Sequence, residues 1–295
     1  MKNLITCSDL HFSYNEKEVL HGINFSVQQG GIVGLLGKNG AGKSTTINIL
    51  MGFLQPDAGE CKVLGYPSHS IPPLVRKRIG LLHEGFTQYD FMSIEEIERY
   101  YAPYYPNWNN ALYYELVDLM HVPHSRKVAR LSCGQRSQVT LGLILAQSPD
   151  LMILDDFSMG LDVGYRRLFL EFLRDYVDQH ETTVLLTSHI VQELDSFLDE
   201  IVIVQEGTIV VSGKKDDFMN TFFCYSLHGN GDAHIAQEGP VMRVERGKGK
   251  TCIYGFADLQ TMQHHIRTQC GMPDAELAHI PLSLEDAFIG LTGRY

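Results

Sequence analysis

Several features that define large protein classes are missing from this sequence. It has no pair of cysteines in a C-x-x-C spacing, and no stretch approaches the roughly 20 apolar residues that a membrane-spanning helix needs. The opening residues also lack the apolar core of a signal peptide. The cysteines are scattered, so we expect reduced thiols rather than a disulfide framework or a zinc site. They are Cys7, Cys61, Cys133, Cys224, Cys252 and Cys270. Work at a membrane would therefore require another chain that crosses it.

Basic charge is scarce as well. The chain has 24 Lys and Arg against 35 Asp and Glu, a net charge of −11. A chain with this balance has no general basic field to hold nucleic acid, so we expect no nucleic-acid partner. Its 295 residues are 44% hydrophobic and 20% charged, which is typical of a globular protein with one large domain and a smaller one.

The most informative segment is a phosphate-binding loop with the spacing G-x-x-x-x-G-K-[ST]. An apolar strand is expected before it, over 31–36, and a helix after it, over 44–53. The loop backbone and the helix N-terminus suit phosphate oxygens, the lysine reaches the β- and γ-phosphates, and the serine hydroxyl binds Mg²⁺. The predicted nucleotide-binding residues are Gly37, Lys38, Asn39, Gly40, Ala41, Gly42, Lys43, Ser44 and Thr45.

Strand patterns alternate with helix patterns through most of the chain, which predicts an α/β fold with a parallel-sheet core. Strands are expected over 4–14, 22–27, 60–64, 79–82, 151–154 and 183–186, with a hairpin over 201–211. Helices are expected within 93–121, after 135, over 165–180 and after 189. The composition changes near residue 221, and the tail predicts three strands, a helix over 258–268 and a closing segment over 282–293.

Two adjacent carboxylates end one of the predicted strands. Four apolar residues, 151–154, precede Asp155 and Asp156. A buried strand of this kind delivers Asp155 to the metal ion beside the phosphates, usually through a water molecule. The simpler alternative is a buried strand followed by two solvated acids, and the upstream phosphate loop favours the metal site.

The segment Leu131-Ser-Cys-Gly-Gln135 resembles the Leu-Ser-Gly-Gly-Gln signature of the nucleotide-binding subunits of ATP-binding cassette (ABC) transporters. Further sequence motifs of this family occur along the chain in the order typical of the family, and the resemblance covers roughly residues 4–230. The resemblance implies that Tyr14 stacks on adenine, that Glu84 takes the place of a loop glutamine near Mg²⁺, and that His189 contacts the γ-phosphate. Gly160-Leu-Asp162 matches the loop after the second carboxylate. The alternative interpretations are that Tyr14 is an ordinary tyrosine at the end of a strand and that His189 has only a structural role.

The resemblance implies a P-loop NTPase cassette with a parallel-sheet core, an N-terminal antiparallel β subdomain, a helical signature subdomain and a small C-terminal α/β appendage. We place the cassette at 4–228 and the accessory domain at 229–295. In this family two cassettes stack head to tail around ATP and Mg²⁺. Ser132, Gly134 and Gln135 would then bind the γ-phosphate held by the partner cassette.

The implied function is an ATPase at the cytoplasmic face of the membrane that powers a transporter through a multi-span membrane subunit. The C-terminal region is similar to that of cassettes from bacterial ABC-2-type exporters, through Ser283-Leu-Glu-Asp-Ala-Phe288 and Leu291-Thr-Gly-Arg294. The internal segment Tyr105-Pro-Asn-Trp108 also resembles a segment of some of those subunits. The alternatives are a slow-turnover ATP-gated switch and a soluble ABC ATPase outside transport. The tyrosine-rich segment before the signature suits a partner surface, or else packs its own subdomain.

Three positions depart from the family pattern. Asp156 replaces the glutamate that polarises the attacking water, and a misplacement of about 1 Å costs on the order of 10²-fold in rate. The replacement therefore points to slow hydrolysis with ATP binding preserved. Glu84 replaces glutamine and still offers an oxygen to Mg²⁺. Cys133 replaces the first signature glycine, where it either crowds the phosphate or is a harmless variant. Homodimer and heterodimer both remain open.

Overall fold

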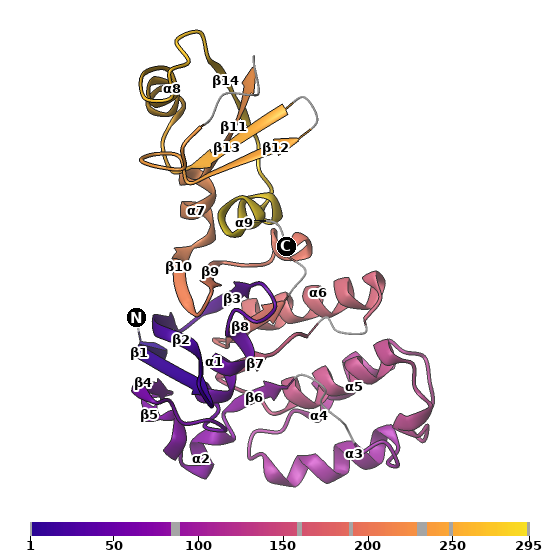
Figure 1. The fold of residues 1–295 in the computed structure, drawn as a ribbon. Helices are drawn as coiled ribbons and strands as arrows, with labels where there is room; N and C mark the ends of the chain where they lie inside the picture. The colour runs from indigo at the N-terminus through magenta and orange to yellow at the C-terminus, as the bar shows by residue number, and fades with distance from the viewer. Residues whose placement is uncertain are drawn as a thin grey trace. The chain divides into compact units, whose positions relative to one another are not determined.

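The computed structural model describes residues 2–83, 89–157, 161–188, 191–228, 235–247 and 250–293. The chain forms two compact units, Met1–Ile190 with Phe197–Ser212, and Val191–Ser196 with Gly213–Tyr295 (Figure 1). This division differs from the boundary expected between residues 228 and 229. The reason is that strand β11 (Phe223–His228) is paired on both sides with strands of the second unit.

The first unit is built on a six-stranded sheet in the order β10-β9-β3-β8-β7-β6. Its strands are β3 (Gly31–Gly37), β6 (Ile79–Leu82), β7 (Leu151–Leu154), β8 (Thr183–Ser188), β9 (Glu200–Gln205) and β10 (Thr208–Lys214). The pairs β3–β8, β3–β9, β6–β7 and β7–β8 are all parallel. Every residue of β7 and β8 is buried, as expected for strands covered on both faces. The predicted parallel-sheet core is therefore confirmed.

An antiparallel sheet in the order β2-β1-β4-β5 forms the predicted N-terminal β subdomain. Its strands are β1 (Asn3–Tyr14), β2 (Lys17–Gln28), β4 (Ala58–Val63) and β5 (Tyr66–Pro67). The hairpin between β1 and β2 turns at Asn15, whose φ of 54° lies in the left-handed region that asparagine tolerates. Strand β2 begins five residues earlier than the predicted start at residue 22, because pairing with β1 extends it.

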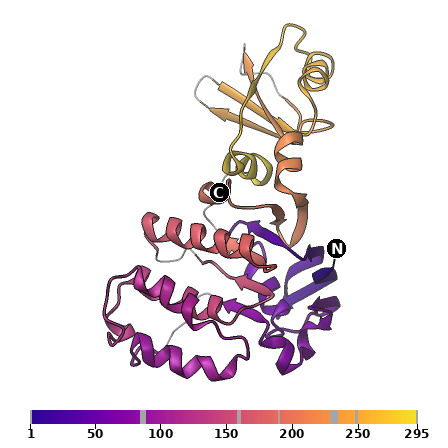
Figure 2. The ribbon, with the colours of Figure 1, turned by 180° about the vertical axis from the view of Figure 1, so that it is seen from behind.

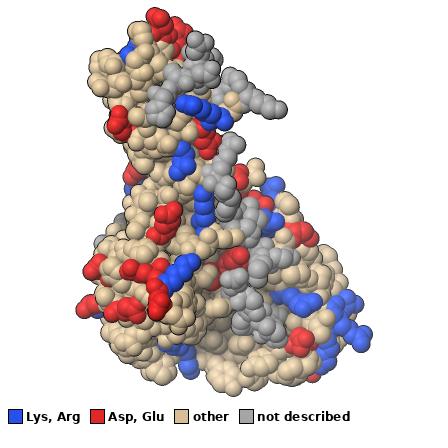
Figure 3. Space-filling view, in the orientation of Figure 1, with Lys and Arg blue, Asp and Glu red and all other residues tan. Residues whose placement is uncertain are grey.

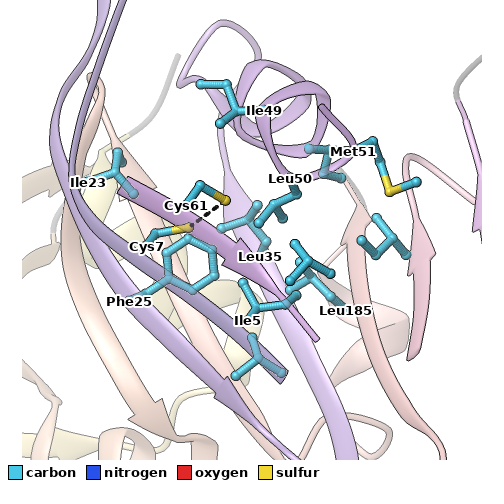
Figure 4. Packing of buried hydrophobic residues seen from close by; sticks show 14 of the residues in the cluster. Ile5, Cys7, Ile23, Phe25, Leu35, Ile49, Leu50, Met51, Cys61 and Leu185 are labelled. Carbon is cyan, nitrogen blue, oxygen red and sulfur yellow. Dashed lines mark hydrogen bonds between the residues drawn. The ribbon is translucent and has the colours of Figure 1, made fainter. Parts of the chain in front are cut away.

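The main core lies between the two sheets, where helix α1 (Lys43–Leu50) packs (Figure 4). Ile5 of β1, Leu35 of β3 and Ile49 of α1 are fully buried there. Cys7 and Cys61 face each other across β1 and β4 with their sulfurs 3.8 Å apart, and both are free thiols. Their hydrogen bond, together with burial, raises the pKa of Cys7 well above its usual value.

Helices α3 (Ile94–Tyr101), α4 (Asn110–Asp118) and α5 (Cys133–Ala146) form the helical signature subdomain, next to α6 (Val163–Gln179) (Figure 2). Capping boxes begin two of them, with Ser93 and Glu96 at α3 and with Ser132 and Gln135 at α5. Their shared core contains the fully buried Tyr113. Short helical segments complete this unit: η1 (Ser68–Ser70), α2 (Pro73–Arg76), η2 (Ala102–Tyr104) and η3 (Val128–Arg130).

In the described residues of the second unit, a four-stranded sheet in the order β12-β13-β11-β14 is accompanied by three α-helices. Helix α7 (Lys215–Thr221) precedes β11. The elements after β11 are β12 (Arg243–Gly247), β13 (Lys250–Gly255), α8 (Leu259–Thr268), β14 (Glu276–Ile280) and α9 (Leu284–Thr292). Strand β14 is absent from the sequence prediction. The helix expected after His189 is only the turn η4 (Gln192–Leu194), because Asp195 ties this segment to Leu284 and Lys215 of the second unit.

Across the described ranges, no helix combines the length and apolar character that a bilayer-spanning segment requires. Figure 3 shows acidic and basic side chains interspersed on one face, with acidic ones gathered where β1 and β4 lie.

Candidate nucleotide-binding site

A cavity of about 710 Å³ opens at the carboxyl ends of the central strands, beside the start of α1. Parallel sheets characteristically bind ligands at this end of their strands. From the predicted set, the cavity is lined by Tyr14, Asn39, Gly40, Gly42, Lys43, Ser44, Thr45, Asp155 and Asp156. The fold therefore brings the loop, the aromatic residue and both carboxylates to one place.

The phosphate loop depends on glycine at two points. Gly42, the residue before α1, has a φ of 107°, and a side chain there would collide with Leu20, 2.6 Å away. A Cβ at Gly37 would lie 2.6 Å from the carbonyl oxygen of Val204 on the neighbouring strand β9. No side chain caps the first turn of α1. Its backbone N–H groups thus suit an anion in the cavity.

Lys43 lies along the loop backbone. Its Nζ donates to the carbonyl oxygens of Gly37, at 2.7 Å, and of Lys38, at 3.1 Å. These bonds hold the positive charge beside the uncapped start of α1, where it reinforces the preference for a negatively charged ligand.

The metal-binding prediction can be tested on Asp155, which is only 2% exposed. Its Oδ1 lies 3.5 Å from Ser44 Oγ and accepts a 2.7 Å hydrogen bond from Thr187 Oγ1. Its Oδ2 is buried and has no hydrogen-bond partner in the described part of the chain. A hydroxyl and an unsatisfied carboxylate oxygen are hard oxygen ligands that suit Mg²⁺. The residues present therefore fit the predicted ion.

Asp156 has an unusual backbone conformation, with a φ of 46°. Its backbone N–H donates to Thr187 Oγ1 at 2.8 Å, and the residue lines the cavity. Aspartate tolerates the left-handed region better than most residues with a side chain.

Tyr14 stands at the end of β1 with 46% of its surface exposed, and it contacts Phe12 edge to face at 4.9 Å. An exposed ring that lines the cavity is suited to stacking on a flat base. Its contact with adenine stays a prediction.

Two predicted residues, Glu84 and His189, and also Gly160 of the loop after the carboxylates, lie outside the described residues. The signature residues are described, but none of them lines the cavity. Instead, Ser132 Oγ accepts from Gln135 N at 3.2 Å, and Gln135 Oε1 accepts from Ser132 N at 3.1 Å. Cys133 is exposed beside them.

The sequence prediction missed several cavity residues, which are Lys17, Glu18, Val19, His21, Thr187, Ser188, Glu206 and Gly207. Thr187 and Ser188 end the strand between β3 and β7, and their place directly before His189 was an available signal. Of these residues, Glu18 hydrogen-bonds to His11 at 2.9 Å, which lowers the pKa of Glu18 and raises that of His11.

Comparison with known proteins gives the same family as the motifs do. A family model described as ABC transporter matches residues 20–158. The chain is 30% identical to the Nod factor export ATP-binding protein I of Sinorhizobium fredii, across 98% of this chain and 86% of that protein. The chain belongs to the ATP-binding subunits of ABC transporters. The protein of the same name from Rhizobium etli is 28% identical over 98% of this chain and 93% of its own length.

This ABC subunit also matches a solved structure of an ABC transporter's ATP-binding subunit. The TM-score is 0.65, with 28% identity over 74% of this chain and 92% of the other. The predicted P-loop fold and the predicted ATPase class are thereby confirmed. The roles of single residues stay predictions.

Proposed function

We propose that this ABC subunit powers export through a separate multi-span membrane protein of the ABC-2 type, from the cytoplasmic face of the membrane. ATP binding closes a pair of cassettes, and hydrolysis with phosphate release reopens them. The proposal is supported by relatives that are named for export and that align with nearly the whole chain, including the second unit. Nod factor is the cargo in those proteins' names, and the cargo of this chain is left open.

One observation carries the two-cassette arrangement. The cavity holds the phosphate loop and both carboxylates, whereas the signature residues Ser132, Gly134 and Gln135 do not line it. A second cassette would bring these three residues to the open side of the nucleotide, with the N-terminus of α5 directed at the γ-phosphate. Each ATP would then be enclosed by two chains, which couples nucleotide binding to closure.

Within one site the roles divide by chemistry. Mg²⁺, held by Ser44 and Asp155, would supply positive charge to the phosphate oxygens. Lys43 and the loop backbone would neutralise the phosphates, and Asp156 would orient the attacking water. His189 would hydrogen-bond the γ-phosphate, and Glu84 would link the site to the helical subdomain.

The surface for the membrane subunit is proposed from exposed aromatic rings. Tyr89, Phe91, Tyr100 and Tyr104, hereafter the aromatic surface, are 42%, 65%, 39% and 53% exposed. Ring contacts of 5.2–5.9 Å join them: Tyr89 touches Phe91 and Tyr100, and Tyr100 touches Tyr104. Aromatic residues that gather on a surface are typical of protein interfaces.

Other aromatic residues of the segment serve the subdomain's own packing. Trp108 donates its indole N–H to Glu98 Oε1 at 2.8 Å and packs against the helical core. Tyr113 is fully buried and donates its hydroxyl to the carbonyl oxygen of Ile94. The packing interpretation of the tyrosine-rich segment therefore applies to Trp108 and Tyr113, and the partner surface is proposed for the aromatic surface alone.

The test is co-purification with a candidate multi-span membrane protein. The double substitution Tyr100→Ala/Tyr104→Ala is expected to abolish co-purification and the stimulation of ATPase activity by the membrane protein. The matched control is Tyr66→Ala on β5, another exposed tyrosine at 42%, which should bind normally. Unchanged binding by the double variant would refute the proposed contact.

A second candidate is an ATP-gated switch that turns over slowly, and the shorter carboxylate of Asp156 favours it. Steady-state ATPase rates, measured with and without the membrane protein, separate the two functions. Strong stimulation supports the transporter, whereas tight ATP binding with no stimulation supports the switch. A chain that works without any membrane partner would instead be a soluble ABC ATPase.

A further inference from the structure

We propose that Thr187 is a positioning residue for both carboxylates of the nucleotide site. Its hydroxyl orients the side chain of Asp155 and holds the backbone of Asp156. The role of Thr187 rests on the proposed ATP and Mg²⁺ site, but it does not depend on transport or on the membrane partner.

The direction of both hydrogen bonds follows from the groups involved. The backbone N–H of Asp156 can only donate, so Thr187 Oγ1 is the acceptor of that 2.8 Å bond. The hydroxyl proton is then directed at Asp155 Oδ1, 2.7 Å away. Thr187 is 1% exposed, so water does not compete for these bonds. One hydroxyl therefore links the metal-side carboxylate with the backbone of the next residue.

The sheet topology explains why this residue can reach both partners. Strand β8 lies between β3, which leads into the phosphate loop, and β7, which leads into the carboxylates. Leu186 pairs with Leu154 across β8 and β7, so Thr187 stands level with Asp155. On the other side Thr187 pairs with Leu35, two residues before the phosphate loop begins.

The first consequence concerns Asp155. Because Thr187 engages Oδ1, the buried Oδ2 is left without a partner in the described part of the chain. An unsatisfied buried carboxylate oxygen is costly unless a cation or water satisfies it. Thr187 thus fixes which oxygen of Asp155 stays available to the metal ion or its water shell.

The second consequence concerns Asp156. Its φ of 46° is unfavourable for a residue with a Cβ and persists only where neighbouring groups enforce it. The hydroxyl of Thr187 is one such group, because it accepts a hydrogen bond from the backbone N–H of Asp156. This hydrogen bond fixes the backbone of Asp156 and thereby the direction in which its side chain points. The direction matters because the side chain of aspartate is short, so a small rotation moves the carboxylate away from its target.

Three substitutions separate positioning from folding. Thr187→Val removes the hydroxyl and keeps the branched shape, and Thr187→Ser keeps the hydroxyl and removes a methyl group. The matched control is Thr183→Val at the opposite end of the same strand. Thr183 is also fully buried, and its hydroxyl accepts a 2.8 Å bond from the N–H of Gly30, far from the cavity.

The experiment measures ATPase kcat, the Mg²⁺ concentration for half-maximal activity, and ATP binding with and without Mg²⁺. Thr187→Val is expected to lower kcat about 10–100-fold, the loss typical of a reacting group displaced by up to 1 Å. It should also raise the half-maximal Mg²⁺ concentration, while the affinity for ATP in excess chelator stays close to that of wild type. Thr187→Ser should keep both kcat and the half-maximal Mg²⁺ concentration close to the wild-type values.

Thr183→Val should lower the unfolding midpoint but leave kcat and the Mg²⁺ dependence unchanged. Positioning by Thr187 is refuted if both valine variants lose activity alike, or if Thr187→Val keeps the wild-type Mg²⁺ response. If the isolated chain turns over too slowly, the Mg²⁺ dependence of ATP binding decides the question alone. Failure of the transporter proposal would show separately, as an ATPase that no membrane partner stimulates.

Discussion

The aromatic ring of Tyr165 fills the space that a side chain at Gly134 would occupy. A Cβ at Gly134 would lie 2.3 Å from Tyr165 Cδ2. Gly134 belongs to the signature at the start of α5, and Tyr165 lies in the first turn of α6, just after the loop that follows the carboxylates. The signature at the start of α5 and the first turn of α6 are thus packed directly on each other.

This contact predicts the effect of Gly134→Ala. The added methyl group overlaps the Tyr165 ring, and overpacking of this kind costs about 1–3 kcal/mol of unfolding free energy. Urea unfolding should show the loss, and it should be smaller when Tyr165→Ala is added, with a coupling of at least about 0.5 kcal/mol. The control is Gly164→Ala, where a Cβ meets nothing closer than 3.4 Å. Additive effects of the two substitutions would contradict the contact.

A second prediction concerns the reach of Asp156. Asp156→Glu is expected to hydrolyse ATP clearly faster than wild type, because the extra methylene restores the length of the usual family residue. Asp156→Asn keeps the size of the side chain and removes the carboxylate, so it should bind ATP and hardly hydrolyse it. Steady-state phosphate release and nucleotide binding measure both. An unchanged or lower rate for Asp156→Glu would exclude reach as the limitation.

The exposed thiol of Cys133 allows a chemical test of the shared ATP site. Modification with N-ethylmaleimide is expected to reduce ATPase activity more than about tenfold, since displacement of signature donors by about 1 Å costs on the order of 10²-fold. Cys133→Ser should resist the reagent. Cys7, Cys61 and Cys224 are buried and should stay unmodified in the folded protein. Full activity of a protein labelled at Cys133 would argue against a signature that contacts nucleotide.

The capping box of α3 predicts a dependence of stability on pH. Glu96 accepts hydrogen bonds from Lys127 Nζ at 2.8 Å and from Ser93 N at 2.7 Å, which lower the pKa of Glu96 to about 2 from 4.5. Because the folded pKa is the lower one, the stabilisation is present above about pH 4.5 and is lost as the pH falls toward 2.

The substitution Glu96→Gln removes this charge and keeps a side chain that can still complete the capping box. Its unfolding midpoint should lie below that of wild type at pH 7, and the gap should narrow steadily below about pH 4.5. Glu95→Gln, in the same helical turn, is the control because Glu95 does not bond Lys127 or Ser93. A gap that stays constant between pH 7 and pH 3 would contradict the assignment.

Much of the fold could be predicted because its signals are local. The apolar runs of β3, β7 and β8 and the glycine spacing around Gly42 each lie within about ten residues. The missed features are set by distant partners. Strand β14 pairs with β11, some 50 residues earlier, and the segment after His189 joins the second unit through Asp195 instead of continuing as a helix.

The sequence by itself determined the chemistry of this protein: a phosphate loop, two adjacent carboxylates and a signature that together mark an ABC ATPase. Only the tertiary structure decided how the side chains share that chemistry. It placed the Thr187 hydroxyl between Asp155 and Asp156, 2.7 and 2.8 Å from its partners. It also kept the signature out of the cavity. Spacing along a chain specifies which groups are present, whereas hydrogen-bond geometry depends on strands that meet only when the sheet forms.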